Sequence, residues 1–327
     1  MGESVTMLAV GDLVPSRRFA AGVTPSPDFA ATMRQIQSAD IAFGDLEMPL
    51  SANGYPKEKL IAFHAAPELV DDLAATGFTI LALANNHSLD YGHEALFDTM
   101  AGLDRVGIRH LGAGQTLDDS LAPVIIEKNG LKIGLLAFTS LLPTGAAASD
   151  RRPGLAPIHV HVAYEVNPYV EMEEPGNPPR VKTWADPDDL AAFAAAIRGL
   201  RPQVDVLAVS AHWGYGAGEL LAEYQRPLGH ALIDAGADVI LGNHVHAVHG
   251  VEVYQGKPIL YSPGNFIAQQ PREGLSDFAI RILDEMSTDG YMAWIELAKD
   301  GATQVRLTPT VTNADGLPVQ AEGEDFE

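Results

Sequence analysis

Two histidines, His244 and His246, stand two positions apart just after an apolar run over residues 237–241, with Gly242 separating the run from the pair. The run is typical of a short buried strand, and in an extended segment residues i and i+2 project to the same side. The two imidazoles can therefore reach one metal ion or two adjacent ions. A surface loop with chance histidines gives the same short pattern, so a metal site needs partners from elsewhere in the chain.

The composition limits the chemistry of such a site. The chain has 327 residues and no cysteine, which excludes thiolate metal sites, disulfides and cysteine nucleophiles. One or two divalent ions would then be held by His, Asp, Glu or Asn, a ligand set suited to Mn, Fe, Zn, Mg or Ca.

Charge and hydropathy indicate the surroundings of the protein. The net charge of −22 argues against nucleic acid as the main partner, because nothing would neutralise the phosphates. No apolar run approaches the ~20 residues needed to cross a bilayer, and no charged-then-apolar leader precedes the first strand. We expect a soluble, cytoplasmic protein that has no membrane partner.

The order of apolar and amphipathic segments predicts the organisation of the chain. Buried strands are expected over 5–10, 40–43, 79–84, 131–138, 204–209 and 237–241, with helices over 28–38, 67–76 and 187–200 between them. This alternation predicts one α/β domain over residues 1–327 with a largely parallel sheet. Residues 140–188 are rich in Pro and Gly and predict a long lid-like insertion, and residues 321–327 predict a flexible acidic tail.

Metal-ligand side chains follow five of these strands. Parallel sheets bind ligands at the carboxyl ends of their strands, and the polar residues found there are Asp12, Asp45 with Glu47, Asn86 with His87, His212, and His244 with His246. Each residue alone has an ordinary structural explanation, such as a turn former or a core histidine. Because all five explanations would have to hold independently, we predict a divalent-metal site at this edge of the sheet.

Several short motifs also follow one another from near the N-terminus to about residue 267. They are Gly11-Asp12, Asp45-Leu46-Glu47, Ala-Asn-Asn-His-Ser-Leu-Asp-Tyr-Gly over 84–92, His212-Trp213-Gly214, Asp-Ala-Gly-Ala-Asp over 234–238, Gly-Asn-His-Val-His over 242–246, and Tyr-Ser-Pro-Gly-Asn-Phe over 261–266. In this order they resemble the CapA branch, the poly-γ-glutamate synthesis protein family, of the calcineurin-like metallophosphoesterase superfamily. The resemblance implies a metallophosphatase-like four-layer α/β/β/α sandwich of two mixed sheets flanked by helices.

The resemblance also implies roles for the ligand-type residues. Asp45 would bridge two ions, one held by Asn86, His212 and His244 and the other by Asp12 and His246. His87 would stand outside the ligands as acid, base or electrostatic stabiliser.

Two positions depart from the family patterns. Val14 occupies the place of a histidine in the phosphoesterases, and Glu47 is the candidate replacement, being on the same side as Asp45 if the segment is extended. CapA-like proteins commonly have Asn where this chain has Asp45. Both one-ion and two-ion sites therefore remain open.

Three functions follow from these residues. In the first, the metal acts as a Lewis acid on a peptide carbonyl while His87 exchanges a proton, with Glu47 or His246 serving the opposite face. Peptide Cα epimerisation is the sharpest version, since soluble CapA-like proteins include peptide epimerases of lasso-peptide pathways. The alternative is phosphoester hydrolysis by two ions ~3.5–4 Å apart, which Val14 weakens. The third is a non-catalytic role in poly-γ-glutamate-type polymer synthesis.

Candidate substrate contacts lie beside the ligands. Arg17 is the one basic residue in a position to hold an anionic group, and Glu219 follows the His-Trp-Gly motif as a pocket residue. Trp213 and Tyr215 are candidates for an aromatic wall against a peptide side chain, although core packing explains them equally well.

Overall fold

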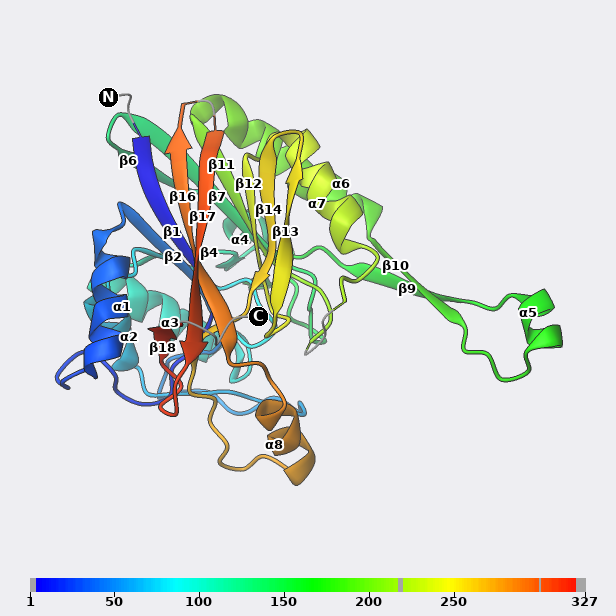
Figure 1. Cartoon of the computed structure of the whole chain (residues 1–327), viewed down its shortest axis with the longest axis horizontal. Coiled ribbons are helices and arrows are strands. Elements are labelled where there is room, and N and C mark those ends of the chain that lie inside the picture. Colours follow the sequence, from blue (N-terminus) through cyan, green and yellow to red (C-terminus); the bar gives the residue numbers. More distant parts are fainter. Residues whose placement is uncertain (1–3, 217–219, 300, 322–327) are drawn as a thin grey trace.

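The computed structural model describes residues 4–216, 220–299 and 301–321 and contains two mixed β-sheets (Figure 1). The first sheet has the strand order β18-β17-β16-β1-β2-β3-β4, and β15 also pairs with β1. Its strands β1 to β4 run parallel, whereas β16 to β18 are antiparallel. The bounds are β1 (Ser4–Val14), β2 (Ile41–Leu46), β3 (Ile80–Ala82), β4 (Arg109–Leu111), β15 (Asn265–Ala268), β16 (Asp289–Ala298), β17 (Gly301–Thr312) and β18 (Pro318–Gln320).

The second sheet has the order β13-β14-β12-β11-β7-β6. Its central strands β7, β11, β12 and β14 are parallel, and β6 and β13 close its two edges in antiparallel hairpins. The bounds are β6 (Val124–Lys128), β7 (Leu131–Thr139), β11 (Val206–His212), β12 (Val239–Asn243), β13 (Val248–Tyr254) and β14 (Lys257–Pro263). Two smaller pairs are β5 (Ala113–Gly114) with β8 (Gly154–Leu155), and β9 (Val160–Glu165) with β10 (Arg180–Ala185).

Three apolar clusters hold the layers together. One lies between the sheets and includes Met7, Phe43 and Ile133. A second joins the outer face of the first sheet to the helices α1 (Pro27–Ser38), α2 (Leu69–Thr76) and α3 (Gly92–Val106). The third joins the second sheet to α6 (Pro187–Leu200) and α7 (Gln225–Ala235). The result is the α/β/β/α sandwich that the sequence predicted, with the two helical layers on opposite sides in Figure 1.

Local signals explain where the helices begin and end. Ser26 caps α1 by accepting the Phe29 N–H, and Asp186 caps α6 by accepting the N–H groups of Asp188 and Asp189. These side chains satisfy donors that the first turn leaves unpaired. Gly77 ends α2 with φ +109°, a backbone conformation that favours glycine. The remaining short helices are α4 (Leu117–Ser120), α5 (Pro168–Glu173), α8 (Asp277–Asp284) and the 3₁₀ turn η1 (Arg201–Gln203).

The segment over residues 140–188 divides into two parts. Residues 143–146 line a cavity together with Asn86. Strands β9 and β10 form a two-stranded ribbon that projects away from the sheets with α5 at its tip (Figure 1). Only the first part therefore lies in the position that the predicted lid would occupy. Of the acidic tail, residues 322–327 lie outside the described part of the chain. Among the residues described, no helix has the length and apolar character needed to cross a membrane.

Close packing around Gly242 generates a stability prediction. A Cβ atom there would lie 2.2 Å from the Tyr261 carbonyl oxygen and 2.6 Å from Trp213 Nε1, whereas one at Gly250 would meet nothing within 4 Å. We expect Gly242→Ala to lower the free energy of unfolding by about 1–3 kcal/mol through overpacking. Gly250→Ala is the matched control and leaves it nearly unchanged. Urea unfolding measures both variants, and equal midpoints for the two would contradict the packing described here.

Candidate metal centre

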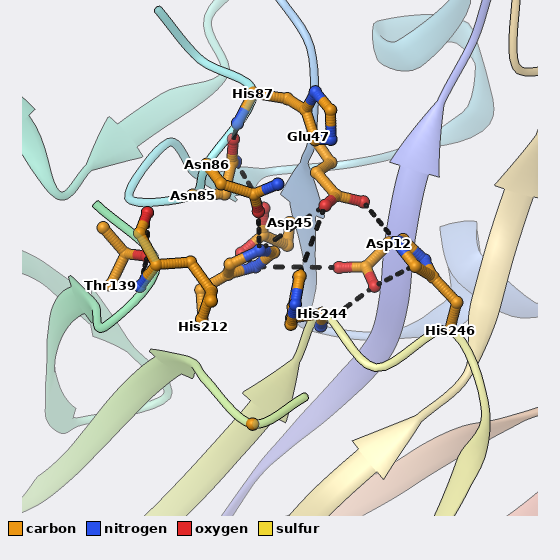
Figure 2. A network of polar contacts seen from close by, with 12 residues as sticks. Asp12, Asp45, Glu47, Asn85, Asn86, His87, Thr139, His212, His244 and His246 are labelled. Carbon is orange, nitrogen blue, oxygen red and sulfur yellow. Dashed lines mark hydrogen bonds and ion pairs between the residues drawn. The ribbon is translucent and has the colours of Figure 1, made fainter. Parts of the chain in front are cut away.

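Strand ends from both sheets meet at one point in the molecule (Figure 2). Asp12 and Asp45 are register partners on β1 and β2 of the first sheet. His212 is the last residue of β11 in the second sheet, and its register partner Asn243 ends β12 just before His244. The short loop after β3 adds Asn85, Asn86 and His87. The structure thus brings together the strand ends that the sequence singled out.

Glu47 occupies the middle of this group. Its backbone N–H donates to the Leu13 carbonyl oxygen at 3.0 Å, which fixes the chain just after β2. Its Oε1 lies 3.4 Å from His212 Nε2 and 3.9 Å from His244 Nδ1, and its Oε2 lies 3.7 Å from His246 Nε2. One carboxylate therefore faces three imidazoles. Val14, which stands where the phosphoesterases have a histidine, is fully buried in the core.

The two aspartates complete the group from the other side. Asp12 Oδ2 accepts the His244 N–H at 3.0 Å and lies 3.6 Å from His246 Nδ1. Asp45 Oδ2 lies 3.4 Å from His212 Nδ1, while its Oδ1 accepts a hydrogen bond from Asn85 Nδ2 at 2.6 Å. Asn85 is a contact that the sequence reasoning missed, because only its neighbours Asn86 and His87 were weighed as ligand or catalyst.

The segment that carries His244 and His246 is not extended, contrary to the prediction. β12 ends at Asn243, and the two histidines have φ values of +100° and +52°. Residues other than glycine rarely adopt such values, and they are held there when surrounding contacts overdetermine the backbone. Here the bond from the His244 N–H to buried Asp12 supplies one such contact. The bend after β12, and not the alternation of an extended strand, directs both imidazoles toward Glu47.

The protonation states of the carboxylates depend on burial and on the imidazoles. Burial raises the pKa of Asp12 well above its usual value, and it also raises the pKa of Asp45, where His212 opposes it. Burial alone would raise the pKa of Glu47, but His246, His212 and His244 outweigh it and hold that pKa well below its usual range.

The histidines respond in opposite directions. Burial would lower the pKa of His212, but Asp45 and Glu47 raise it to about 10. Burial lowers the pKa of His244 to about 3, with Glu47 opposing the shift. In the metal-free group His212 therefore carries a proton and His244 is neutral, and a divalent ion would displace the His212 proton on binding. Carboxylate oxygens and imidazole nitrogens are donors that such ions select.

Unpartnered ligand atoms test whether a metal fits. Within the described residues, Asp12 Oδ1, Asp45 Oδ2, His212 Nδ1, His244 Nδ1 and both Glu47 oxygens are buried without a hydrogen bond. Buried polar atoms of this kind are normally paired. Their ligand atoms form three overlapping sets within 4.8 Å: Asp12, Asp45 and His212; Glu47, His212 and His244; and Asp12, Glu47 and His246. Asn86 Oδ1 lies 2.6 Å from His212 Nε2 beside these sets. The residues present fit one or two divalent ions.

His87 stands at the edge of the group in Figure 2 and is held by an ion pair. Its Nδ1 lies 2.5 Å from Oδ2 of buried Asp90, which also pairs with Lys59 and accepts the Phe63 N–H. Lys59 Nζ donates to the Asn86 carbonyl oxygen at 2.7 Å and so ties this pair to the ligand loop. The His87-x-x-Asp90 spacing was a signal available in the sequence. Lys59 carried no signal, because it lies 28 residues before His87 outside any motif.

A cavity of about 440 Å³ is lined by Asn86, Leu89 and Asp90, the sequence neighbours of His87. Two ion-pair members, Lys59 and Asp90, line it together with Asn86, and Lys57 and His93 bring further basic side chains to its wall. The sequence reasoning found only Arg17 as a basic candidate, because the loop over residues 57–59 lies far from the motifs in sequence. Of the candidate ligands, Asn86 is the one that lines this cavity.

The four residues predicted to contact substrate lie in different surroundings. Trp213 is fully buried, donates its indole N–H to the Tyr261 carbonyl oxygen and packs against Phe138, so the prediction of a substrate-facing wall is wrong for it. Its side chain packs in the apolar cluster between the second sheet and α7. Tyr215 is 46% exposed. The Arg17 guanidinium donates to the Asp315 carbonyl oxygen, away from the ligand group. Glu219 lies outside the described residues.

Comparisons of sequence place these features in a family. The family model described as "Bacterial capsule synthesis protein PGA_cap" matches residues 6–270. The chain is 30% identical over 306 residues to the Sinorhizobium fredii protein y4sH, covering 81% of this chain and 66% of that relative. It is 28% identical over 321 residues to the PGA biosynthesis protein CapA of Bacillus subtilis, covering 96% of this chain and 73% of the relative. The chain therefore spans about two thirds to three quarters of the length of these relatives.

Comparison of structures supports the fold. A crystal structure of a phosphatase from Mycoplasma pneumoniae superposes with a TM-score of 0.51 over 95% of each chain, at 12% sequence identity. At this identity the likeness concerns the architecture alone. It agrees with the metallophosphatase-like sandwich derived from the layers.

The ligand sets generate a prediction about bound metal. Glu47→Gln keeps the side-chain shape but removes the charge that faces three imidazoles, so we expect affinity for a divalent ion to fall at least about tenfold. Exposed Glu68 begins α2 without a capping hydrogen bond, and Glu68→Gln is the control with unchanged affinity. Elemental analysis and titration with Mn²⁺ measure the effect.

Chelation tests the same site without a mutation. Removing a bound ion leaves three buried carboxylates facing one another, so EDTA should lower the melting temperature of the native protein. A purified protein that carries no divalent ion and whose melting temperature is unchanged by chelator would refute the metal site.

Proposed function

This chain belongs to the bacterial capsule synthesis protein (PGA_cap) family, and we propose that it is a divalent-metal-dependent enzyme that acts on a peptide by acid/base chemistry. The observation that carries the proposal is the set of buried, unpartnered carboxylate and imidazole atoms directly beside the His87–Asp90 pair. A ligand group next to a proton-transfer group is what metal-assisted acid/base catalysis requires.

We assign the ligands in two groups that share Glu47. His212 and His244, with Asn86 beside them, form one group, and Asp12 with His246 forms the other. Asp45 forms a third ligand set with Asp12, from one group, and His212, from the other. A bound divalent ion would supply a Lewis acid that polarises a substrate carbonyl and stabilises the negative charge that develops on it.

His87 is the proposed proton-transfer residue. Asp90 occupies Nδ1 of its ring and orients the imidazole, and Phe63 packs on the ring with centroids 4.6 Å apart. Nε2 is then the nitrogen that exchanges a proton with substrate. The peptide would approach from the adjoining cavity, whose wall includes Asn86 and Asp90.

Cα epimerisation is the specific reaction we propose. In this reaction one base removes the Cα proton and an acid returns a proton to the opposite face, so that no atom is gained or lost. His87 serves one face. Glu47 is enclosed by three imidazoles and is assigned as a ligand. When a single ion is held by Glu47, His212 and His244, His246 is not needed as a ligand and serves the other face. A peptide substrate is in keeping with the Bacillus subtilis relative, whose name refers to PGA biosynthesis.

Phosphoester hydrolysis is the second candidate, and a specific observation favours it. Lys57 and Lys59 line the cavity beside Asn86 and bring positive charge to the place where a phosphoryl group would sit. The fold shared with the Mycoplasma pneumoniae phosphatase points the same way. Lys59 is already paired with Asp90, however, so only Lys57 is available to an anionic group.

A pair of assays separates the two reactions. The metal-loaded protein is incubated in heavy water with a pool of synthetic peptides that together contain all amino acids, and mass spectrometry follows deuterium at Cα. A parallel assay uses bis(p-nitrophenyl) phosphate. We expect deuterium incorporation. His87→Gln should lower its rate about 10²–10⁴-fold, the usual contribution of a general acid or base to the rate.

His110→Gln provides the control for this substitution. His110 lies on β4 and pairs with Asp104, so this variant should keep full activity, and both variants should keep their bound metal. Phosphate ester cleavage that His87→Gln abolishes, without deuterium incorporation by the native protein, would overturn epimerisation in favour of hydrolysis.

A further inference from the structure

The ribbon of residues 160–185, here called the arm, consists of β9, the tip helix α5 and β10. It extends from the body of the protein beyond both sheets (Figure 1). The two strands are in antiparallel register, with Val160 opposite Ala185 at the base and Glu165 opposite Arg180 at the outer end.

One face of the arm is apolar along its length. Residues that oppose each other in an antiparallel pair share a face, and every second residue returns to it. Val162 therefore lies beside Thr183, and Tyr164 beside Val181, on the same face as the base pair. We call Val162, Tyr164 and Val181 the arm face. Their exposed fractions are 54%, 70% and 43%.

The arm face adjoins the apolar core at the base of the arm and is exposed to solvent further out. At the base, Val160 and Ala185 pack against the apolar cluster between the second sheet and α6 and α7. Further out, Val162, Tyr164 and Val181 are exposed, whereas Thr183, which lies beside Val162 on the same face, is only 8% exposed. Contiguous exposed apolar area of this kind marks an interaction surface.

The charged side chains on the opposite face of the arm form ion pairs. Lys182 pairs with Glu165, Arg180 with Glu223 of the body, and His161 with Asp186 at the base. These contacts hold the polar face toward the body and water. Trp184 on this opposite face is also 46% exposed but lies against His161, with ring centroids 5.5 Å apart, whereas the arm face has three exposed apolar side chains next to one another.

The arm tip limits which partner fits. Tyr169 and Met172 of α5 are 78% and 79% exposed, and the tip also carries the exposed carboxylates of Glu171, Glu173 and Glu174. Three negative charges would repel the anionic surface of a membrane or a nucleic acid. The apolar and acidic combination is suited to a protein surface.

We propose that the arm face docks against the arm face of a second copy of this chain, in an antiparallel arrangement about a two-fold axis. An isologous contact requires a surface that complements itself, and a flat apolar ribbon face does so. The antiparallel direction keeps the two acidic tips at opposite ends, whereas a parallel direction would place them side by side.

The available area agrees with a reversible dimer. The arm face together with Tyr169 and Met172 offers on the order of 500 Å² per copy, and thus about 1,000 Å² in total, the size of a weak specific interface. A dimer formed in this way leaves the cavity beside Asn86 and the metal-ligand group unobstructed, and the inference is independent of the proposed reaction.

Light scattering of the full chain over a range of concentrations provides the test. We expect the apparent mass to rise from that of the 34.8 kDa chain toward twice that value. The double variant Val162→Thr and Tyr164→Thr keeps strand propensity but removes apolar area, and it should weaken dimerisation at least about tenfold. Val253→Thr is the control, since Val253 is a strand valine with 70% exposure elsewhere on the surface, and it should dimerise like the native chain.

Cross-linking locates the contact. Because the chain has no cysteine, Tyr164→Cys creates a single thiol, and a flexible bismaleimide should join two copies through it. Val253→Cys should give no covalent dimer. Circular dichroism checks that every variant is folded. A native chain that is monomeric up to about 200 µM, equal dimerisation of native and arm variants, or arm-dependent binding to phosphatidylcholine vesicles would each overturn the proposal.

Discussion

The carboxylates of Asp12, Asp45 and Glu47 are fully buried within a few ångströms of one another. Charges removed from water are costly unless opposite charges or hydrogen-bond donors surround them. In this protein the carboxylates are surrounded by three imidazoles, one backbone N–H and one asparagine amide. The positive φ values of His244 and His246 follow from the same requirement, because the bend that strains the backbone also delivers both rings to the carboxylates.

The relative placement of the two sheets decides whether this group exists. Two of its carboxylates sit on strands of the first sheet, and the imidazoles come from the end of β11 and the bend after β12 in the second. The apolar cluster between the sheets fixes how far one can slide over the other. Gly242 adds a local condition, because only a residue without Cβ allows β12 to approach the Tyr261 carbonyl and Trp213 so closely. The chemistry of the site thus depends on the packing of an apolar interior some distance from it.

The group is asymmetric with respect to access. The cavity adjoins Asn86 and Asp90, at the His87 end, whereas His246 is contacted by buried Asn265 at the other end. Of the candidate ligands, Asn86 lines this cavity, and Asp90 on its wall holds the His87 ring. Lys59 has a positioning function, since it joins Asp90 to the ligand loop through the Asn86 carbonyl.

The sequence by itself determined the order of strands and helices and the types of ligand, whereas the four-layer sandwich was implied by the family resemblance. Apolar periodicity located the strands and helices, caps such as Asp186 set helix ends, and polar residues after five strands indicated where ligands would gather. These are local features, and parallel topology carries them to one edge. Only the tertiary structure decided that Glu47 stands at the centre, that Trp213 belongs to the core, that Lys59 joins His87 and that an arm leaves the body. Each of these depends on contacts between segments distant in sequence, and such contacts are set by packing between layers, which local patterns do not encode.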